Sequence, residues 1–350
     1  MTVFPPLTKA TVLAFQTSSW VDLFSSITIK TSVIRPLPAD FRQYLESDGI
    51  AMPEGSEDVV AQSSLSDDDA SEHGSGDGSD DDGPLVKYAF PELDAQIRLI
   101  MAAYGGAVFP KLNWTSPKDA AWMLNPSSPL KCTSPSDVYL YLKSSDFVGH
   151  DLDPEMVFDG CVDEEGPEGS PYELELVLKK WYPIDRSREL RCFVRGDVLV
   201  GICQRDTNFY DHLIKAETQS LMRETVSTFF RDKIKGKFLG GPNYIFDILL
   251  TRSLESAHII DFNPYAPRTD ALLFTYEELH MLSSSSPTNL PELRVITSRG
   301  HPMASRNAPA NQHNMIPREA LELSQGRDIQ EFHAEWMEQV QAATKQDSKP

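Results

Sequence analysis

Residues 243–264 read NYIFDILLTRSLESAHIIDFNP and contain two short apolar runs, each interrupted by an acid. The runs are rich in Ile, Leu and Phe, and a polar stretch rich in Ser separates them, which is typical of two strands joined by a loop. If the strands pair antiparallel around residues 251–257, Leu250 lies opposite His258. We therefore expect a β-hairpin here, and its register decides which side chains meet.

This register predicts that two carboxylates face each other. Asp247 lies opposite Asp261, with Cβ atoms about 5 Å apart, and Asn263 shares their face because alternate strand residues point the same way. Two adjacent anions among apolar residues are costly unless a cation lies between them, and a few hard oxygen ligands suit Mg²⁺ shared with phosphate oxygens. The alternative is that these residues satisfy loops at a sheet edge, and a slip of one residue would turn Asp247 away.

Basic residues upstream could supply the phosphate side of such a site. Lys111 ends the expected strand AVFPKLNW after a Gly-Gly turn, and Arg191 and Arg205 stand on opposite arms of an expected hairpin. Taken alone, a strand Lys or Arg is more often a solvated edge residue than a ligand. The sequence has no P-loop, no Rossmann glycine fingerprint and no serine-hydrolase or cysteine-protease motif, so these classes are not indicated.

The elements around the hairpin alternate between helix and strand patterns. Residues 90–106 predict an amphipathic helix stopped by two glycines, and residues 172–182 alternate as a strand. Residues 189–206 predict a hairpin whose two-residue loop, Gly196-Asp197, is of the Gly-first kind. Helices mixed with mostly antiparallel strands favour an α+β fold over a doubly wound parallel sheet.

Charge is concentrated in one segment of the chain. The net charge is −20, and residues 54–82 carry eleven acids and no Lys or Arg. Such a stretch buries too little apolar surface to order itself, so residues 54–84 are expected to be a disordered acidic loop. The acidic balance argues against direct nucleic-acid binding, and no run is long and apolar enough for a membrane span. Four scattered cysteines and the lack of a secretory leader favour reduced thiols inside the cell.

Several segments, in this order, resemble the cell division cycle protein 123 (D123) family. The resemblance runs from about Trp20 to Leu282, is interrupted by the acidic loop, and rests on FPKLNWTSPKDAAW, YELELVLKKW, LRCFVRGDVLVGICQRD, FYDHL, YIFDI, IDFNP and TDALLFTYEEL. It implies an ATP-grasp-like fold with two lobes of mostly antiparallel sheets around a nucleotide cleft, which binds ATP and Mg²⁺. It also implies a cytoplasmic assembly chaperone that binds the C-terminal domain of the γ subunit of eukaryotic translation initiation factor 2 and promotes its joining to α and β.

The resemblance also implies roles for individual residues. Lys111 would contact phosphate, with Asn113 beside it, and Arg191 would face the phosphates. Residues 172–182 would be the hinge strand along adenine, where Glu175 and Val177 contribute backbone groups and Lys179 lies nearby. The ligands of Mg²⁺ would be Asp247, Asp261 and Asn263, in agreement with the hairpin argument.

The expected organisation has five parts: residues 1–53 in the first lobe, the acidic loop 54–84, the rest of the first lobe at 85–171, the second lobe at 172–282, and a variable tail at 283–350 with one possible helix at 318–343. Two other functions stay open beside the chaperone. One is an ATP-grasp carboxylate–amine ligase, which needs a second pocket for an acid substrate, and the other is a scaffold with a vestigial nucleotide site. Exposed aromatic residues such as Trp20 or Trp181 could anchor a partner, although burial in the core is favoured for either of them.

Overall fold

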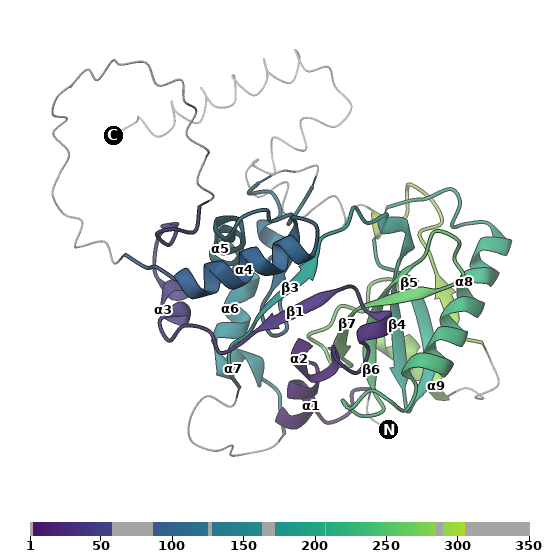
Figure 1. Ribbon diagram of the computed structural model, residues 1–350. Coiled ribbons are helices and arrows are strands. Elements are labelled where there is room, and N and C mark those ends of the chain that lie inside the picture. Colours follow the sequence, from purple (N-terminus) through teal and green to yellow (C-terminus); the bar gives the residue numbers. More distant parts are fainter. Residues whose placement is uncertain are drawn as a thin grey trace, which may run out of the picture.

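The computed structural model describes residues 3–57, 87–124, 128–162, 172–206, 208–284 and 290–304. Within them the chain forms two lobes that lie side by side (Figure 1). The smaller lobe contains a three-stranded sheet in the order β1-β3-β2, and the larger lobe contains a five-stranded sheet in the order β7-β6-β4-β5-β8. All neighbouring strands are antiparallel except β5 and β8. The predicted α+β fold with mostly antiparallel sheets is therefore confirmed.

The strands are β1 (Thr31–Ile34), β2 (Val108–Lys111), β3 (Leu176–Lys180), β4 (Glu189–Arg195), β5 (Val198–Gln204), β6 (Tyr244–Leu250), β7 (Ala257–Pro264) and β8 (Glu292–Arg294). The α-helices are α1 (Lys9–Ala14), α2 (Thr17–Trp20), α3 (Phe41–Glu46), α4 (Pro91–Ala103), α5 (Pro135–Lys143), α6 (Asp146–Leu152), α7 (Pro154–Val157), α8 (Ala216–Phe229) and α9 (Tyr276–Ser284). A π-helical turn, Phe230–Ile234, extends α8, and short 3₁₀ turns lie at Ser25–Ile27, Lys118–Ala120 and Arg186–Arg188. No helix among the described residues is long and apolar enough to cross a membrane.

The core of the smaller lobe forms between α4 and one face of its sheet. Leu93, Ile97 and Met101 follow one another at four-residue spacing, so they form a single stripe on α4, and all three are buried. Leu176 and Leu178 point from β3 into the same core. Val177 and Lys179, which alternate with them, therefore face the opposite side of this sheet, toward the larger lobe.

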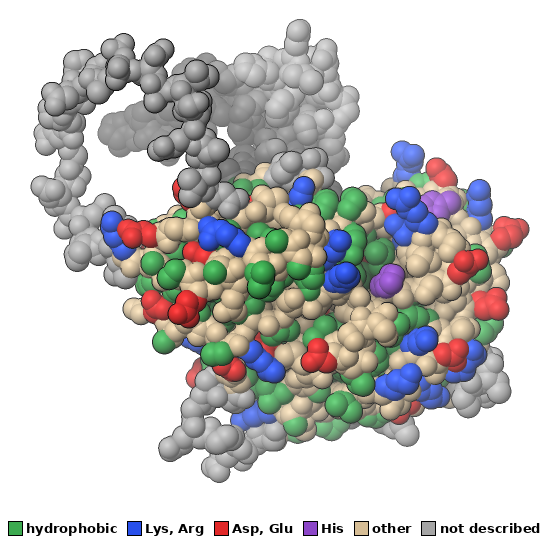
Figure 2. Space-filling view, in the orientation of Figure 1, with side chains coloured by type: hydrophobic (Ala, Val, Ile, Leu, Met, Phe, Trp, Pro, Cys, Tyr) green, Lys and Arg blue, Asp and Glu red, His purple; other side chains and the backbone are tan. Residues whose placement is uncertain are grey.

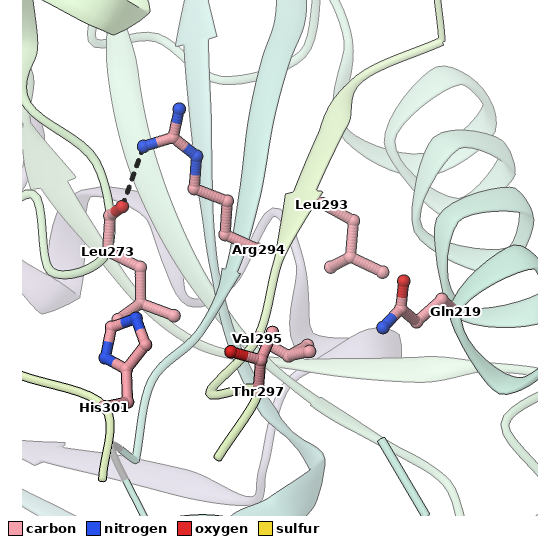
Figure 3. A pocket seen from close by; sticks show the side chains of 7 residues that line it. All are labelled: Gln219, Leu273, Leu293, Arg294, Val295, Thr297 and His301. Atoms are coloured by element: carbon pink, nitrogen blue, oxygen red, sulfur yellow. Dashed lines mark hydrogen bonds between the residues drawn. The ribbon is translucent and has the colours of Figure 1, made fainter. Parts of the chain in front are cut away.

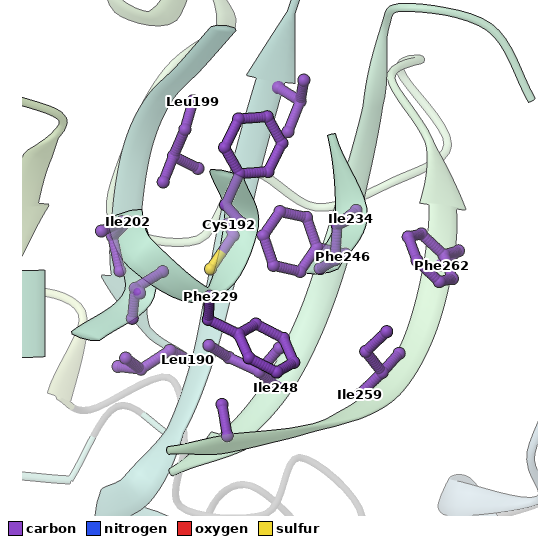
Figure 4. Packing of buried hydrophobic residues seen from close by; sticks show 14 of the residues in the cluster. Leu190, Cys192, Leu199, Ile202, Phe229, Ile234, Phe246, Ile248, Ile259 and Phe262 are labelled. Carbon is purple, nitrogen blue, oxygen red and sulfur yellow. The ribbon is translucent and has the colours of Figure 1, made fainter. Parts of the chain in front are cut away.

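The larger lobe has a core on each face of its sheet. On one face, α8 and the turn after it pack against alternate residues of the strands, including Cys192, Phe246 and Phe262 (Figure 4). The rings of Phe238 and Phe262 stack with centroids 4.3 Å apart. On the other face, Leu279 of α9 is fully buried with residues of β4, β5 and β6. The strands therefore place their polar residues on the α9 face, beside this second core.

Segment 1–53 contributes to both lobes. Trp20 of α2 is only 1% exposed and packs edge-on against Phe262, in the core of the larger lobe, whereas β1 belongs to the smaller sheet. Trp20 is therefore core and not a surface anchor, and the partly buried Trp181 donates from its indole to the carbonyl of Pro129. Strand β8, within the expected tail at 283–350, adds a fifth strand that the sequence did not indicate.

Three further expectations concern a turn, a loop and a helix. The turn at Gly196 and Asp197 has φ of 58° and 59°. Both central residues are thus left-handed, which is the I′ pattern, and the Gly-first turn expected there is wrong. Most of the expected acidic loop, residues 54–84, lies outside the described residues, and so does the whole of the possible helix at 318–343.

Candidate functional site

A β-bulge sets the register of the hairpin that carries the carboxylates. Asp247 pairs with Asp261, as predicted, but Leu250 lies opposite Ala257 instead of His258, and the register shifts by one residue between Asp247 and Ile248. The extra residue on β7 is Ile260. The pairing expected beside the loop is therefore wrong by one residue, and the bulge restores the expected pairing at the two acids.

Asp247 is held by two arginines. Arg191 donates to both of its carboxylate oxygens, at 2.8 and 2.9 Å, and Arg205 donates to one of them at 3.0 Å. Arg191 pairs with Asp247 across β4 and β6, and with Cys203 across β4 and β5. Arg205 follows Cys203 by two residues, so its side chain projects to the same face of the sheet. Burial alone would raise the pKa of Asp247, yet the two guanidinium groups hold that pKa well below its usual range.

Asp261 is held by a lysine from the other lobe. Lys111 at the end of β2 is 1% exposed, and its Nζ lies 2.5 Å from Asp261 Oδ2. Burial would raise the pKa of Asp261, but Lys111 and then Lys179 lower it overall. The ion pair links the two sheets, so the carboxylate hairpin and the predicted phosphate lysine do come together.

Lys179 of β3 reaches the bulge itself. Its Nζ donates to the carbonyl oxygen of Ile260 at 2.5 Å and lies 5.6 Å from the centre of the Trp20 ring. Burial, above all, lowers the pKa of Lys179 to about 8. The unpaired residue of a bulge leaves a backbone group free from the ladder, which explains how one carbonyl can accept from a side chain.

Lys118 is a further cation that sequence reasoning missed. It begins the 3₁₀ turn Lys118–Ala120, is exposed to solvent, and lies close enough to Arg205 that the arginine's charge lowers the pKa of Lys118 to about 7. A single 3₁₀ turn has no periodicity, so no sequence pattern marks this lysine. The seven residues Lys111, Lys118, Lys179, Arg191, Arg205, Asp247 and Asp261 are called the interface cluster below.

The hinge strand, whose backbone is expected to contact adenine, takes part in the smaller sheet. β3 is the central strand of its sheet, and Val177 pairs with both Val33 and Lys111, so its backbone groups belong to the sheet and are not available to a base. The N–H of Glu175 is also taken, because it donates to Asn113 Oδ1 at 3.0 Å. What Val177 presents toward the larger lobe is its side chain, on the same face as Lys111.

Glu175 has one carboxylate oxygen paired and one unpaired. Oε1 accepts from Arg35 at 2.8 Å, and the residue is fully buried. Oε2 is also buried, and among the described residues it has no hydrogen-bond partner. An unsatisfied buried acceptor costs about 1–3 kcal/mol, so this atom is suited to receive a donor from a ligand.

Asn113 joins two segments of the smaller lobe. Its Nδ2 donates to the carbonyl of Glu173 at 2.8 Å, and its Oδ1 accepts from Glu175, so both ends of the amide bind the chain just before β3. The structure thus gives Asn113 a positioning role near Lys111. Asn263 lies two residues after Asp261 on β7, and no hydrogen bond of its amide is found within the described part of the chain.

The carboxylates alone do not form a closed metal site. Within the described ranges, no group of three or more His, Cys, Asp or Glu side chains lies close enough together to hold a metal ion. Both acids of the hairpin are paired with cations instead. A metal ion here would therefore depend on ligands brought by another molecule, as Mg²⁺ does when it is shared with phosphate.

Comparisons with known proteins agree on one family. A family model described as D123 matches residues 20–324. The translation initiation factor eIF2 assembly protein of Schizosaccharomyces pombe is 37% identical over 338 residues, which is 95% of this chain and 97% of that protein. Cell division cycle protein 123 of Aspergillus terreus is 39% identical over 298 residues, covering 83% of this chain and 67% of that protein.

A solved structure is similar as well. The structure of Cdc123 from Schizosaccharomyces pombe matches with a TM-score of 0.65 and 36% sequence identity. The match covers 84% of this chain and 100% of that one. The likeness therefore extends over most of this chain.

Proposed function

This chain belongs to the D123 family, and on that premise we propose that it is an assembly factor for eukaryotic translation initiation factor 2 whose interface cluster binds ATP with Mg²⁺. The proposal combines the function for which its relatives are named with one feature of this molecule. That feature is the excess of positive charge in the interface cluster.

The cations of the interface cluster outnumber its carboxylates. Five cations, Lys111, Lys118, Lys179, Arg191 and Arg205, converge on Asp247 and Asp261. Glu189 pairs with Arg205 at 3.2 Å and adds a third carboxylate, so the positive charge is still in excess. The pKa of Lys118 is lowered chiefly by the charge of Arg205, and that of Lys179 chiefly by burial. Buried positive charge without sufficient counter-charge is unfavourable, and a polyphosphate would supply the missing negative charge.

The residues present fit ATP in two further respects. The unpaired Oε2 of Glu175 offers an acceptor on the face that carries Lys111, which suits the exocyclic amine of a purine. The apolar side chain of Val177 lies beside it on that face and suits a flat base. In this proposal the lysines and arginines hold the phosphates, and backbone groups of Val177 take no part.

The residues also fit Mg²⁺, provided that phosphate is present. Asp247, Asp261 and the amide of Asn263 supply oxygen ligands, and the metal would neutralise part of the phosphate charge. The arginines and lysine that pair with the two acids would then turn toward the phosphates. The metal and the nucleotide are therefore expected to bind together and not independently.

The proposed fold type is ATP-grasp-like. The two lobes with mostly antiparallel sheets that meet at a charged interface support the fold type.

The proposed partner is the C-terminal domain of the γ subunit, in the cytoplasm. On the face shown in Figure 2, charges of both signs are interspersed with hydrophobic side chains. Among the apolar side chains that a partner could cover, Leu99 of α4 is 72% exposed. The net charge of −20 would speed encounter with a basic partner surface.

Calorimetry tests the proposal. ATP is titrated with and without Mg²⁺ into the full chain, and the titration is repeated with the γ-subunit domain present. Binding of Mg²⁺-ATP and of the domain is expected, whereas the absence of nucleotide binding would make the interface cluster structural. Sustained ADP release with ATP and candidate acids would favour the ligase alternative.

A further inference from the structure

A cavity of about 220 Å³ lies beside the interface cluster. Its apolar wall includes Val12, Phe15 and Phe262, and its polar wall includes His150, Asn263 and Arg268. Because Asn263 lies two residues from Asp261 on the same face of β7, the cavity adjoins the cluster without containing its cations. It is called the Arg268 cavity below.

The histidine of this cavity is oriented by a buried carboxylate. Asp151 is fully buried and accepts from the backbone N–H groups of Trp114 and Thr115, at 2.8 and 2.9 Å, and from the Thr115 hydroxyl at 2.7 Å. His150 Nδ1 lies 2.9 Å from its Oδ1 and donates to it. This contact fixes the ring and leaves Nε2 for another partner.

The arginine of this cavity is held in place by backbone carbonyls. Arg268 donates to the backbone carbonyls of Val157, at 2.7 Å, and of Asp159, which hold the side chain in place without neutralising it. No ion pair of Arg268 is found within the described ranges. An oriented guanidinium with donors left over is a preferred partner for a carboxylate.

A second cavity, within the larger lobe, is bigger but has no arginine with unbalanced charge. It has a volume of about 310 Å³ and lies between α8 and β8, lined by Gln219, Arg294 and His301 among others (Figure 3). Its arginine donates to the Leu273 carbonyl and is already paired with Glu278 and Glu292, at 2.8 and 2.7 Å. The charge on that wall is therefore balanced, and the cavity offers no comparable attraction for an anion.

We propose that the Arg268 cavity binds a ligand with a carboxylate and a short apolar group. The carboxylate would meet Arg268 and the Nε2 of His150, and the amide of Asn263 would serve a further polar group of the ligand. The apolar group would lie against Val12, Phe15 and Phe262. Both a small organic acid and the C-terminal residue of a peptide have this chemistry, and binding here does not require that the interface cluster binds ATP.

Fluorine NMR of the full chain labelled with 5-fluorotryptophan gives a local readout. Trp114 lines the Arg268 cavity, whereas Trp20 lies beside Lys179 of the interface cluster, and Trp→Phe variants assign the two signals. N-acetyl-leucine mimics a chain terminus, 4-methylpentanoate mimics a free acid, and N-acetyl-leucinamide is the control without a carboxylate. A saturable shift of Trp114 with at least one acid, but not with the amide, is expected, and the acid that binds identifies the source.

Two variants tie that shift to the cavity. Arg268→Gln is expected to weaken acid binding about tenfold because it removes a charged hydrogen-bonding partner, and His150→Gln is expected to weaken it too. Arg252→Gln, which changes an exposed arginine outside the cavity, should leave binding unchanged. An unliganded spectrum like that of the wild type shows that each variant is folded.

Equal binding of acids and amide, equal binding by Arg268→Gln, or no shift of Trp114 would overturn the proposal. The shift of the Trp20 signal on addition of Mg²⁺-ATP is measured separately and reports on the interface cluster. A chain that shifts Trp114 with acids but binds no nucleotide would support the cavity and contradict only the proposed ATP site.

Discussion

The ammonium group of Lys179 donates to the backbone carbonyl of Ile260, the one extra residue of β7, at 2.5 Å. A side chain from the smaller sheet thus binds a backbone group that the larger sheet leaves free. This contact and the ion pair of Lys111 with Asp261 fix how the two lobes meet. The interface cluster is therefore specified by both sheets together.

The first prediction concerns Asp261. Asp261→Asn keeps the size of the side chain but removes the charge, so it should abolish the part of ATP affinity that depends on Mg²⁺. Calorimetry should then give the same ATP affinity with and without the metal. Asp211→Asn, which changes an exposed acid, should behave like the wild type, and an undiminished Mg²⁺ effect in Asp261→Asn would refute the metal assignment.

The second prediction concerns Asp247 and acid. Its pKa lies below the ordinary value, so its contribution to stability is complete above the unfolded-state pKa and is lost as pH falls toward the folded-state pKa. Asp247→Asn leaves two arginines without their shared carboxylate and should lower the free energy of unfolding by about 3–5 kcal/mol at pH 7. The deficit relative to wild type should shrink below about pH 4.

Urea unfolding at several pH values measures this deficit. Asp232→Asn provides a control, because Asp232 pairs with Arg231 at the surface, and it should leave the free energy of unfolding close to that of the wild type at every pH. A deficit for Asp247→Asn that stays constant down to pH 2 would contradict the linkage.

The third prediction concerns Lys118. With a pKa of about 7, this lysine is partly neutral at pH 7.5, and nearby phosphates would raise its pKa again. ATP binding should therefore take up roughly 0.5–0.8 proton at this residue. Calorimetry in buffers of different ionisation enthalpy measures the uptake, which Lys118→Met should remove and Lys233→Gln should leave in place.

The fourth prediction concerns the packing of α9. A Cβ added at Gly201 would lie 2.9 Å from Leu279 Cδ2 and 3.1 Å from Phe274 Cζ. Gly201→Ala should therefore destabilise the fold by about 1–3 kcal/mol. Gly149→Ala meets no atom within 4 Å in α6 and should be neutral or slightly stabilising, by up to about 1 kcal/mol. Thermal unfolding distinguishes the two, and equal melting temperatures would contradict the steric account.

The facing pair of Asp247 and Asp261 could be predicted because alternation along two strands fixes which residues share a face. The bulge at Ile260 could not, since pairing that starts at the loop gives a different register from pairing at the acids. The two registers differ by one residue, and only tertiary packing shows where the extra residue lies.

Other parts of the site could not be predicted from the sequence for related reasons. The sequence marks residues 172–182 as a strand but does not say that it is central, so the loss of Val177's backbone to the sheet could not be foreseen. Lys118 lies on a single turn without a pattern, and only the fold brings it near Arg205. Local patterns thus predicted the strands and some charged residues, while sheet order decided what those residues can touch.

The position of α2 affects how this molecule can be divided. Because Trp20 and its neighbours cover the core of the larger lobe while the next strand, β1, belongs to the smaller one, each lobe is assembled from distant stretches of the chain. A recombinant fragment that starts at residue 172 would expose the apolar surface that Phe15, Trp20 and Phe24 cover. Such a fragment should aggregate, and mixing it with residues 1–171 should restore solubility by fragment complementation.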